Sequence, residues 1–262
     1  MAISQSPRAD AAQLHLLFAK GKRPDVAAIT AFAKRQQAVA LSHDLSTDGT
    51  QSVDDSRLGQ QPICVELLRD GLTFDLSGLS PAPGSAFPTI NHRFDLSVIP
   101  TSAGYEALLL VPGPHLVAGA RSQPVIRTMM ALACDLILHF DELRAVCWSP
   151  SCSAIGRRFF ESIISAWLDG GPFPALGLTA FAEQSDGGLQ SEGLAFWIGQ
   201  ELRIEPPLSA DKVAATRLGI RLVNQLMLSG GMDADDRIIA PDGTPLVLRP
   251  SRNRALISVW RE

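Results

Sequence analysis

Apolar and polar residues alternate in the stretch that follows Pro62, which is the pattern of a half-buried β-strand. Ile63, Val65 and Leu67 fall on one face there, and the alternation resumes after Asp70-Gly71. Two alternating runs joined by Asp-Gly are typical of a β-hairpin, because both residues tolerate the positive φ of a tight turn. The sequence therefore predicts a hairpin centred on Asp70-Gly71.

Other segments show either this strand pattern or the spacing of a buried helix face. Helix-start signals stand at Ser122, at Pro150-Ser151 and at Ser209, each before an apolar periodic run. The predicted helices span 124–140, 151–167 and 209–228, and the predicted strands span 94–99, 105–111, 144–148, 175–181, 194–205, 238–248 as a hairpin around Asp242-Gly243, and 255–260.

This order of elements contains hairpins but no regular alternation of strand and helix. It favours an α+β fold with a mixed or mostly antiparallel sheet and helices packed on one face, and it argues against a TIM barrel. No G-x-G-x-x-G or P-loop sequence occurs, so a Rossmann fold and a nucleotide-type cofactor are not expected.

The first 61 residues differ from the rest in their pattern. Residues 9–20 and 25–36 have helical composition, and a polar stretch covers residues 42–61. We therefore expect a helical N-terminal extension with a polar linker at 1–61, followed by one α+β domain at 62–262. An extension of this kind could mediate assembly.

Composition narrows the class of protein. The chain has 262 residues, of which 46% are hydrophobic and 19% charged, as in packed globular proteins. Its formal net charge of −4 argues against a nucleic-acid surface or an anionic-membrane surface spread over the molecule. The most apolar stretch, 124–140, is interrupted by Arg127 and Asp135 and is short for a bilayer span. With no secretory signal in the sequence, a bacterial cytoplasmic protein is expected.

The cysteines and histidines form no metal-binding pattern. The four cysteines show no CxxC spacing, and the five histidines form no HxxxH or HExxH cluster. We therefore expect four reduced thiols, no metal site and no cofactor; the cysteines are Cys64, Cys134, Cys147 and Cys152.

Several short motifs between His115 and Glu262 carry a resemblance to a protein family. They are Cys147-Trp-Ser-Pro150, Phe173-Pro-Ala-Leu-Gly-Leu-Thr179, Asp186-Gly-Gly188, Glu192-Gly-Leu-Ala-Phe-Trp-Ile-Gly-Gln-Glu201 and Pro241-Asp-Gly243. On these residues, a little over half of the chain resembles an uncharacterised bacterial family known as a domain of unknown function. The resemblance implies a similar α+β core and no particular activity.

Cys152 is the first candidate for chemistry, because it stands where a strand is predicted to end and a helix to begin. A thiol at a helix N-terminus can form a thiolate at lower pH, and His115, which follows another strand, could act as its base. The simpler interpretation is that Cys147 fills the core and that Ser151 or Cys152 only caps the helix.

Candidate binding residues are acidic, basic or aromatic. Asp186, Glu192, Glu201 and Glu205 stand on or beside one predicted hairpin, where carboxylates can do acid–base work, although turn acids are usually only solvated. Two basic groups could each bind a phosphate or a carboxylate, or could pair with Asp233, Asp235 and Asp236. They are Arg217 and Arg221, one helical turn apart, and the cluster Arg249, Arg252 and Arg254 near the C-terminus. Trp148, Trp167 and Trp197 could line an aromatic pocket or fill the core.

Two functions from different classes follow. A non-enzymatic binding or interaction protein is the leading hypothesis, because no strong catalytic, metal or nucleotide motif is present. The alternative is a small hydrolase or transferase that uses a cysteine nucleophile. The expected partner is a protein or a small anionic ligand, and neither nucleic acid nor a membrane is expected.

Overall fold

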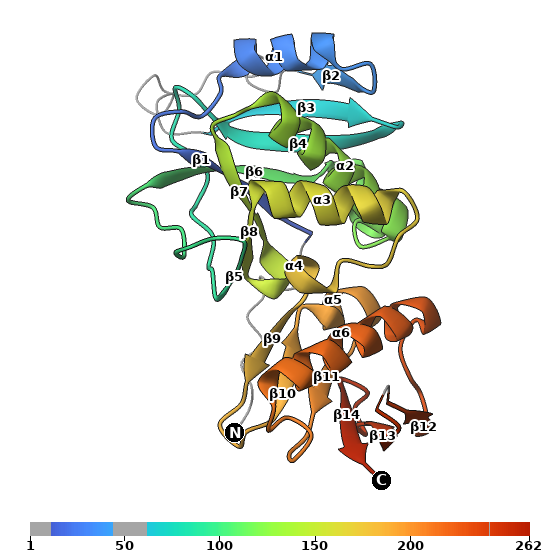
Figure 1. Cartoon of the computed structure of the whole chain (residues 1–262). Helices are drawn as coiled ribbons and strands as arrows, with labels where there is room; N and C mark the ends of the chain where they lie inside the picture. Colours follow the sequence, from blue (N-terminus) through green and yellow to red (C-terminus); the bar gives the residue numbers. More distant parts are fainter. Residues whose placement is uncertain (1–11, 44–61, 241) are drawn as a thin grey trace. The chain divides into compact units, whose positions relative to one another are not determined.

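A computed structural model describes residues 12–43, 62–240 and 242–262 (Figure 1). These residues form two sheets, each mixed but mostly antiparallel, together with helices, which confirms the predicted α+β class. The described chain divides into two compact units, residues 12–171 and residues 172–262. We call them the N-terminal unit and the C-terminal unit. The two units divide at Pro172, whereas the sequence pattern predicted a boundary at residue 61.

The N-terminal unit contains an eight-stranded sheet in the order β2-β3-β4-β6-β1-β7-β8-β5. Its strands are β1 (Leu14–Ala19), β2 (Val39–His43), β3 (Ile63–Arg69), β4 (Leu72–Leu79), β5 (His92–Phe94), β6 (Tyr105–Pro112), β7 (Leu143–Trp148) and β8 (Ser153–Gly156). Its helices are α1 (Val26–Arg35), the 3-10 helix η1 (Pro114–Gly119), α2 (Gln123–His139), the 3-10 helix η2 (Ser149–Ser151) and α3 (Arg157–Leu168).

Strand β1 lies in the middle of this sheet, antiparallel to β6 and to β7. The helix predicted at 9–20 is therefore wrong where the structure describes it, and the segment is no separate extension. Residues 14–18 are all buried, because both faces of the sheet are covered. A short, continuously apolar run does not distinguish a buried strand from a buried helix. The second predicted helix is confirmed as α1, whereas most of the predicted linker, residues 44–61, lies outside the described residues.

Helices α2 and α3 pack side by side on one face of the sheet (Figure 1). The two charged residues that interrupt the apolar stretch of α2 both have partners. Arg127 donates to the carbonyl oxygens of Trp167 and Leu168 at 3.1 and 2.8 Å and thereby caps the end of α3. Asp135 forms an ion pair with Arg69 on β3.

The segment between β4 and β6 covers the opposite face of the sheet. Leu96 and its apolar neighbours pack there against a buried cluster that includes Leu17, Ala145 and Cys147. This segment was predicted to hold a strand at 94–99, but only His92–Phe94 pairs, in parallel with β8. Of the apolar residues that suggested a longer strand, Leu96 anchors the loop, whereas Val98 and Ile99 are exposed.

The C-terminal unit contains a six-stranded sheet in the order β12-β13-β14-β11-β10-β9. Its strands are β9 (Ala180–Glu183), β10 (Leu189–Glu192), β11 (Glu201–Ile204), β12 (Asp236–Ile239), β13 (Pro245–Pro250) and β14 (Leu256–Arg261). Its helices are α4 (Ala175–Leu178), α5 (Leu194–Ile198) and α6 (Lys212–Ser229).

Two strands predicted in this unit are partly helical. Residues 175–178 form α4 before β9 begins, and residues 194–198 form α5 rather than the start of β11. Gly193 and Gly199 have φ values of +90° and +78°, and they bracket α5. Such left-handed backbone interrupts a strand, which is why the apolar run 194–198 leaves the sheet.

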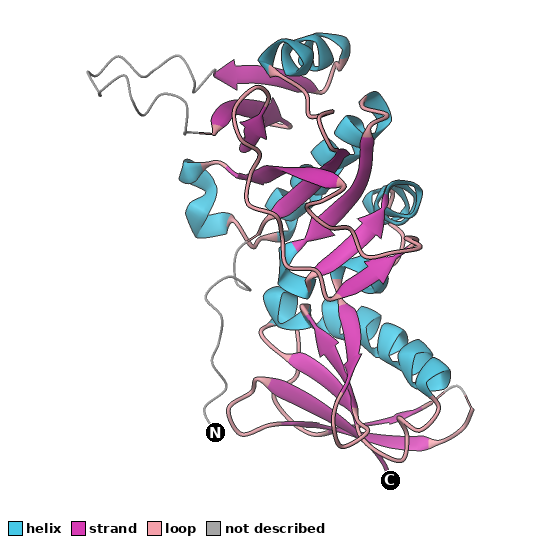
Figure 2. Ribbon diagram, turned by 90° about the vertical axis from the view of Figure 1, so that its left-hand side faces the viewer, coloured by secondary structure: helices cyan, strands magenta, loops and turns pink. Residues whose placement is uncertain are grey.

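Helix α6 lies along one face of the C-terminal sheet (Figure 2). Its buried residues include Leu222, Val223 and Leu226, as its periodicity predicts. Gly219 permits a close approach, since a Cβ there would lie 2.6 Å from the ring of Phe181. Within the described residues, no helix is long and apolar enough to cross a membrane.

Candidate functional site on helix α6

In the structure Cys152 does not lie at the N-terminus of a helix. Strand β8 separates this residue from α3, which begins at Arg157, so the helix start predicted at Ser151 is wrong. Cys152 instead ends the turn η2 with a φ of +48°, and its Sγ lies 3.6 Å from the carbonyl oxygen of Ser149. A helix dipole therefore provides no reason for its thiol to ionise easily.

Nor does the fold bring His115 to Cys152. The His115 Nε2 atom lies 3.0 Å from Thr73 Oγ1 on β4. Strand β4 stands four positions from β8 in the sheet, which is about 19 Å at the usual strand spacing. The histidine at the η2 turn is His15, whose Nδ1 lies 3.3 Å from Ser149 Oγ. Sequence reasoning missed His15, because its position depends on the pairing of β1 with β7.

All four cysteines are free thiols. Burial raises the pKa of Cys64 to about 11, with Asp75 and Glu66 adding to the shift. Burial also raises the pKa of Cys134 to about 12 and that of Cys147 further still. These three thiols stay protonated at neutral pH and are poor nucleophiles.

Asp75 and Glu66 face each other directly across β3 and β4. Burial raises the pKa of Asp75, and the charge of Glu66 raises it further. Because the folded state then binds this proton more readily than the unfolded state, Asp75 costs stability above its folded pKa, and the cost disappears as the pH falls below its ordinary value.

We expect Glu66→Gln to raise stability at pH 7 by less than about 1 kcal/mol, since both side chains are partly exposed. The gain should shrink toward pH 3.5, where Asp75, whose pKa is raised, is protonated and no longer repels a neighbouring charge. Urea titrations at the two pH values measure the difference. An equal gain at both values would show that charge repulsion is not its cause.

Trp148 and Glu201 have structural roles. Trp148 is fully buried at the end of β7. Glu201 is mostly buried and accepts from Ser191 Oγ and from the backbone N–H groups of residues 193, 194 and 195. Glu192 is partly buried at the end of β10. Among the described residues, no group of three or more acidic, histidine or cysteine side chains is placed to hold a metal ion.

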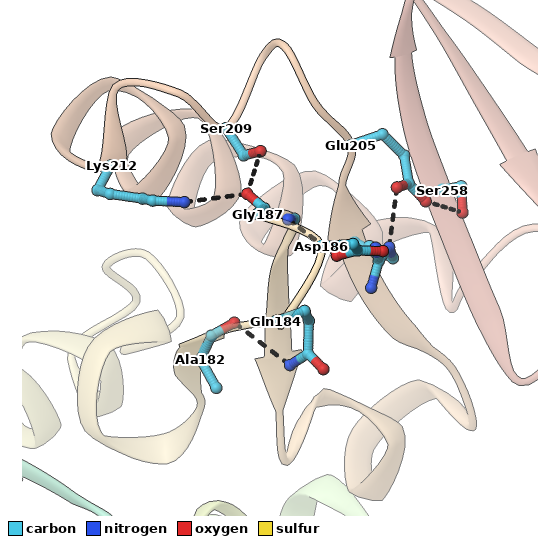
Figure 3. Close-up of polar contacts among 10 residues, drawn as sticks. Ala182, Gln184, Asp186, Gly187, Glu205, Ser209, Lys212 and Ser258 are labelled. Atoms are coloured by element: carbon cyan, nitrogen blue, oxygen red, sulfur yellow. Dashed lines mark hydrogen bonds and ion pairs between the residues drawn. The ribbon is translucent and has the colours of Figure 1, made fainter.

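A polar network holds the turn between β9 and β10 (Figure 3). Arg203 pairs with Asp186 and, at 2.9 Å, with Glu205, which accepts a second bond from Ser258 Oγ at 2.9 Å. A hydrogen bond from the backbone N–H of Gly188 lowers the pKa of Asp186, and Arg203 lowers it further. Each charge in the network has a partner, so its role is to fix the turn and to join β11 to β14.

The same turn anchors the beginning of α6. Ser209 Oγ and Lys212 Nζ both donate to the carbonyl oxygen of Gly187, at 2.7 and 3.0 Å, as Figure 3 shows. Asp211, rather than the predicted Ser209, caps the helix by accepting from the N–H groups of Val213 and Ala214. These bonds fix the rotation of α6, and hence which residues face outward.

The outward side of α6 carries two exposed apolar residues and two arginines. Val213 is 60% exposed and Leu228 is 92% exposed, and Arg217 and Arg221 between them are also exposed. At about 100° of rotation per residue, the four side chains fall within an arc of about 80°. We call these four residues the α6 stripe; it is about 22 Å long at 1.5 Å per residue.

The arginines of the α6 stripe form no ion pair within the part of the chain that the structure describes. The acidic partners that seemed available bind other residues: Asp233 pairs with Arg254, and Asp235 pairs with Arg249. The pairing expected between these acids and the basic residues is therefore found for Arg249 and Arg254, and it is wrong for Arg217 and Arg221.

A cavity of about 250 Å³ lies at the C-terminal end of α6. Its lining includes the apolar side chains of Leu226, Met232 and Leu248 together with Asp233. It also includes Gln225, an exposed residue one turn after Arg221. The cavity therefore adjoins the α6 stripe.

Comparison with protein-family models, with curated proteins and with solved structures gives no match for this chain.

Proposed function

We propose that the protein is a non-enzymatic interaction protein and that its α6 stripe docks a protein partner. The observation that carries the proposal is the arrangement of two exposed apolar residues around two arginines that form no ion pair with any described residue. Arginine is enriched at protein interfaces, and it contributes most where neighbouring apolar groups exclude water.

The α6 stripe is positively charged, unlike the chain as a whole, and it does not stabilise the fold. It carries two positive charges on a protein whose formal net charge is −4. Like charges at i and i+4 destabilise a helix by a few tenths of a kcal/mol. Exposing Leu228 contributes nothing to the fold, whereas burying such a side chain against a partner contributes about 1.5–3 kcal/mol.

We therefore expect the double variant Arg217→Ala/Arg221→Ala to be as stable as the wild type or slightly more stable. Alanine removes the repulsion and has the higher helix propensity, so the change should lie between about 0 and 1 kcal/mol in favour of the variant. Thermal unfolding followed by circular dichroism measures it. A loss of more than about 1 kcal/mol would mean that the arginines serve the fold, and the proposal would fail.

Docking itself is tested by site-specific photo-crosslinking in cells that make the protein. A photoreactive amino acid replaces Arg217 on α6 or, as the matched control, Arg158, an exposed arginine on α3. We expect a discrete adduct only from position 217, and we expect Arg221→Glu to remove it. Equal adducts from both positions, or none from position 217, would contradict the proposal.

The cysteine-nucleophile alternative lacks the geometry on which it depended, since Cys152 has neither a helix N-terminus nor His115 beside it. We expect the Cys152 thiol to react slowly with iodoacetamide near pH 6, because no helix N-terminus favours its thiolate there. Alkylation rates against pH, with peptide mapping and a Cys152→Ser control, measure this. Rapid alkylation of Cys152 near pH 6 would revive the enzyme alternative.

A further inference from the structure

We propose that the partner of the α6 stripe is an acidic amphipathic protein segment, with two carboxylates placed for Arg217 and Arg221 and apolar side chains beyond them. This inference rests on the proposed function and specifies the chemistry of the partner.

The spacing of the stripe defines what it can bind. Arg217 and Arg221 are separated by about 6 Å along the helix axis, which is the separation of two acidic residues four apart on a partner helix. Each guanidinium can hold one carboxylate through two parallel hydrogen bonds. Val213 lies about 6 Å before the first arginine, and Leu228 about 10 Å after the second. The complementary pattern is apolar, acidic, acidic, apolar.

A small anion fits this surface less well than a protein segment does. The two arginines are exposed on a convex helix, and the described cavity lies beyond them at the end of α6, so no wall encloses an anion between them. An isolated phosphate would also leave Val213 and Leu228 in water. A segment that covers the whole stripe buries both apolar residues and strengthens the charge pairs by excluding water.

Nucleic acid fits less well for a different reason. A duplex presents one phosphate about every 1.7 Å of its axis, so binding along the stripe would bring many phosphates against only two positive charges. The rest of the chain carries an excess of negative charge and would repel that backbone. A partner with two carboxylates matches the two arginines of the α6 stripe, neither of which forms an ion pair with a described residue.

The test uses the full-length protein and a labelled synthetic helical peptide. The peptide carries two glutamates four residues apart and a leucine beyond each of them, and fluorescence anisotropy measures its binding. We expect each single arginine-to-alanine change to weaken binding about fivefold, and the double reversal Arg217→Glu/Arg221→Glu to weaken it about a hundredfold. Leu228→Ser should also weaken it.

Reversing the charges on both the protein and the peptide distinguishes specific docking from nonspecific electrostatic attraction. A second peptide with lysines in place of the glutamates should bind the doubly reversed protein and not the wild type. Arg237→Glu is the matched control, because Arg237 on β12 lies outside the stripe and already pairs with Glu262. That variant should bind the acidic peptide as the wild type does. Circular dichroism confirms that each variant is folded.

Three results would overturn the inference: no binding of the acidic peptide, equal binding of both peptides by the wild type, or complete displacement of the acidic peptide by an equimolar amount of phosphate. Its failure can be distinguished from failure of the proposed function. A specific adduct at position 217 in cells, together with no binding of the acidic peptide, would reject this partner chemistry and leave the docking role of α6 standing.

Discussion

Replacing Glu201 by alanine is expected to destabilise the C-terminal unit by about 3–5 kcal/mol, because several buried groups lose their acceptor at once. The carboxylate accepts from the N–H groups of Gly193, Leu194 and Ala195 at 2.9, 3.2 and 3.1 Å, and also from Ser191 Oγ. In the alanine variant the donors at the start of α5 and the Ser191 hydroxyl lose this partner, while the N–H of Leu202 on β11 still donates to Ser191 Oγ at 2.7 Å.

Glutamine is the informative control at position 201. Burial raises the pKa of Glu201, which means that holding the charged carboxylate in the folded protein has a cost. Glu201→Gln removes that cost but keeps one acceptor oxygen, so we expect it to destabilise less than the alanine variant. The stability difference between the wild type and each variant should narrow as the pH rises from the ordinary glutamate pKa through the raised folded pKa of Glu201, because only the wild type has this group to titrate. The difference between the two variants should stay constant over that range.

Hydrogen exchange measured by mass spectrometry locates the effect. Protection should fall across residues 189–204 in the alanine variant, whereas peptides from the N-terminal unit provide an internal reference. If protection there is unchanged and the whole protein loses less than about 1 kcal/mol, the buried N–H groups must find other partners, and our account of Glu201 is wrong.

The parts of the fold that the sequence predicts well have local causes. The hairpin around Asp70-Gly71 is confirmed, with φ values of +49° and +79° at the two turn residues. Helix α6 is also confirmed within a few residues. The failures are segments whose structure depends on distant partners: β1 is buried on both faces because both sides of the sheet are covered, and it pairs with β6 and β7, which begin only at Tyr105 and Leu143.

The candidate site was partly predictable for the same reason. The helical spacing of Arg217 and Arg221 is visible in the sequence and made them binding candidates. The sequence does not show that they lack ion pairs with the described residues, because this depends on the fold. In the structure Asp235 pairs with Arg249 and Asp233 pairs with Arg254. The exposure of Leu228 depends on how the anchored helix is rotated on its sheet. The resemblance to a bacterial family stays a prediction, since no comparison tests it.

The N-terminal unit offers a second large effect, at the point where the loop after β5 crosses the end of β8. Gly156 ends β8, and a Cβ added there would lie 2.4 Å from the carbonyl oxygen of Asp95. This oxygen belongs to the backbone, and Phe94 just before it pairs with Ile155, so neither side can move without breaking the parallel pairing of β5 and β8.

We therefore expect Gly156→Ala to destabilise the N-terminal unit by about 2–3 kcal/mol, as overpacking of a rigid contact does. Gly104→Ala is the matched control, because nothing lies within 4 Å of the added Cβ there, and its effect should be small or slightly stabilising. Hydrogen exchange in peptides covering β5 and β8 shows whether the loss of protection is largest around this contact. Equal stability of the two alanine variants would show that the loop moves away from position 156 without loss of stability. The pairing of β5 with β8 would then not depend on this close contact.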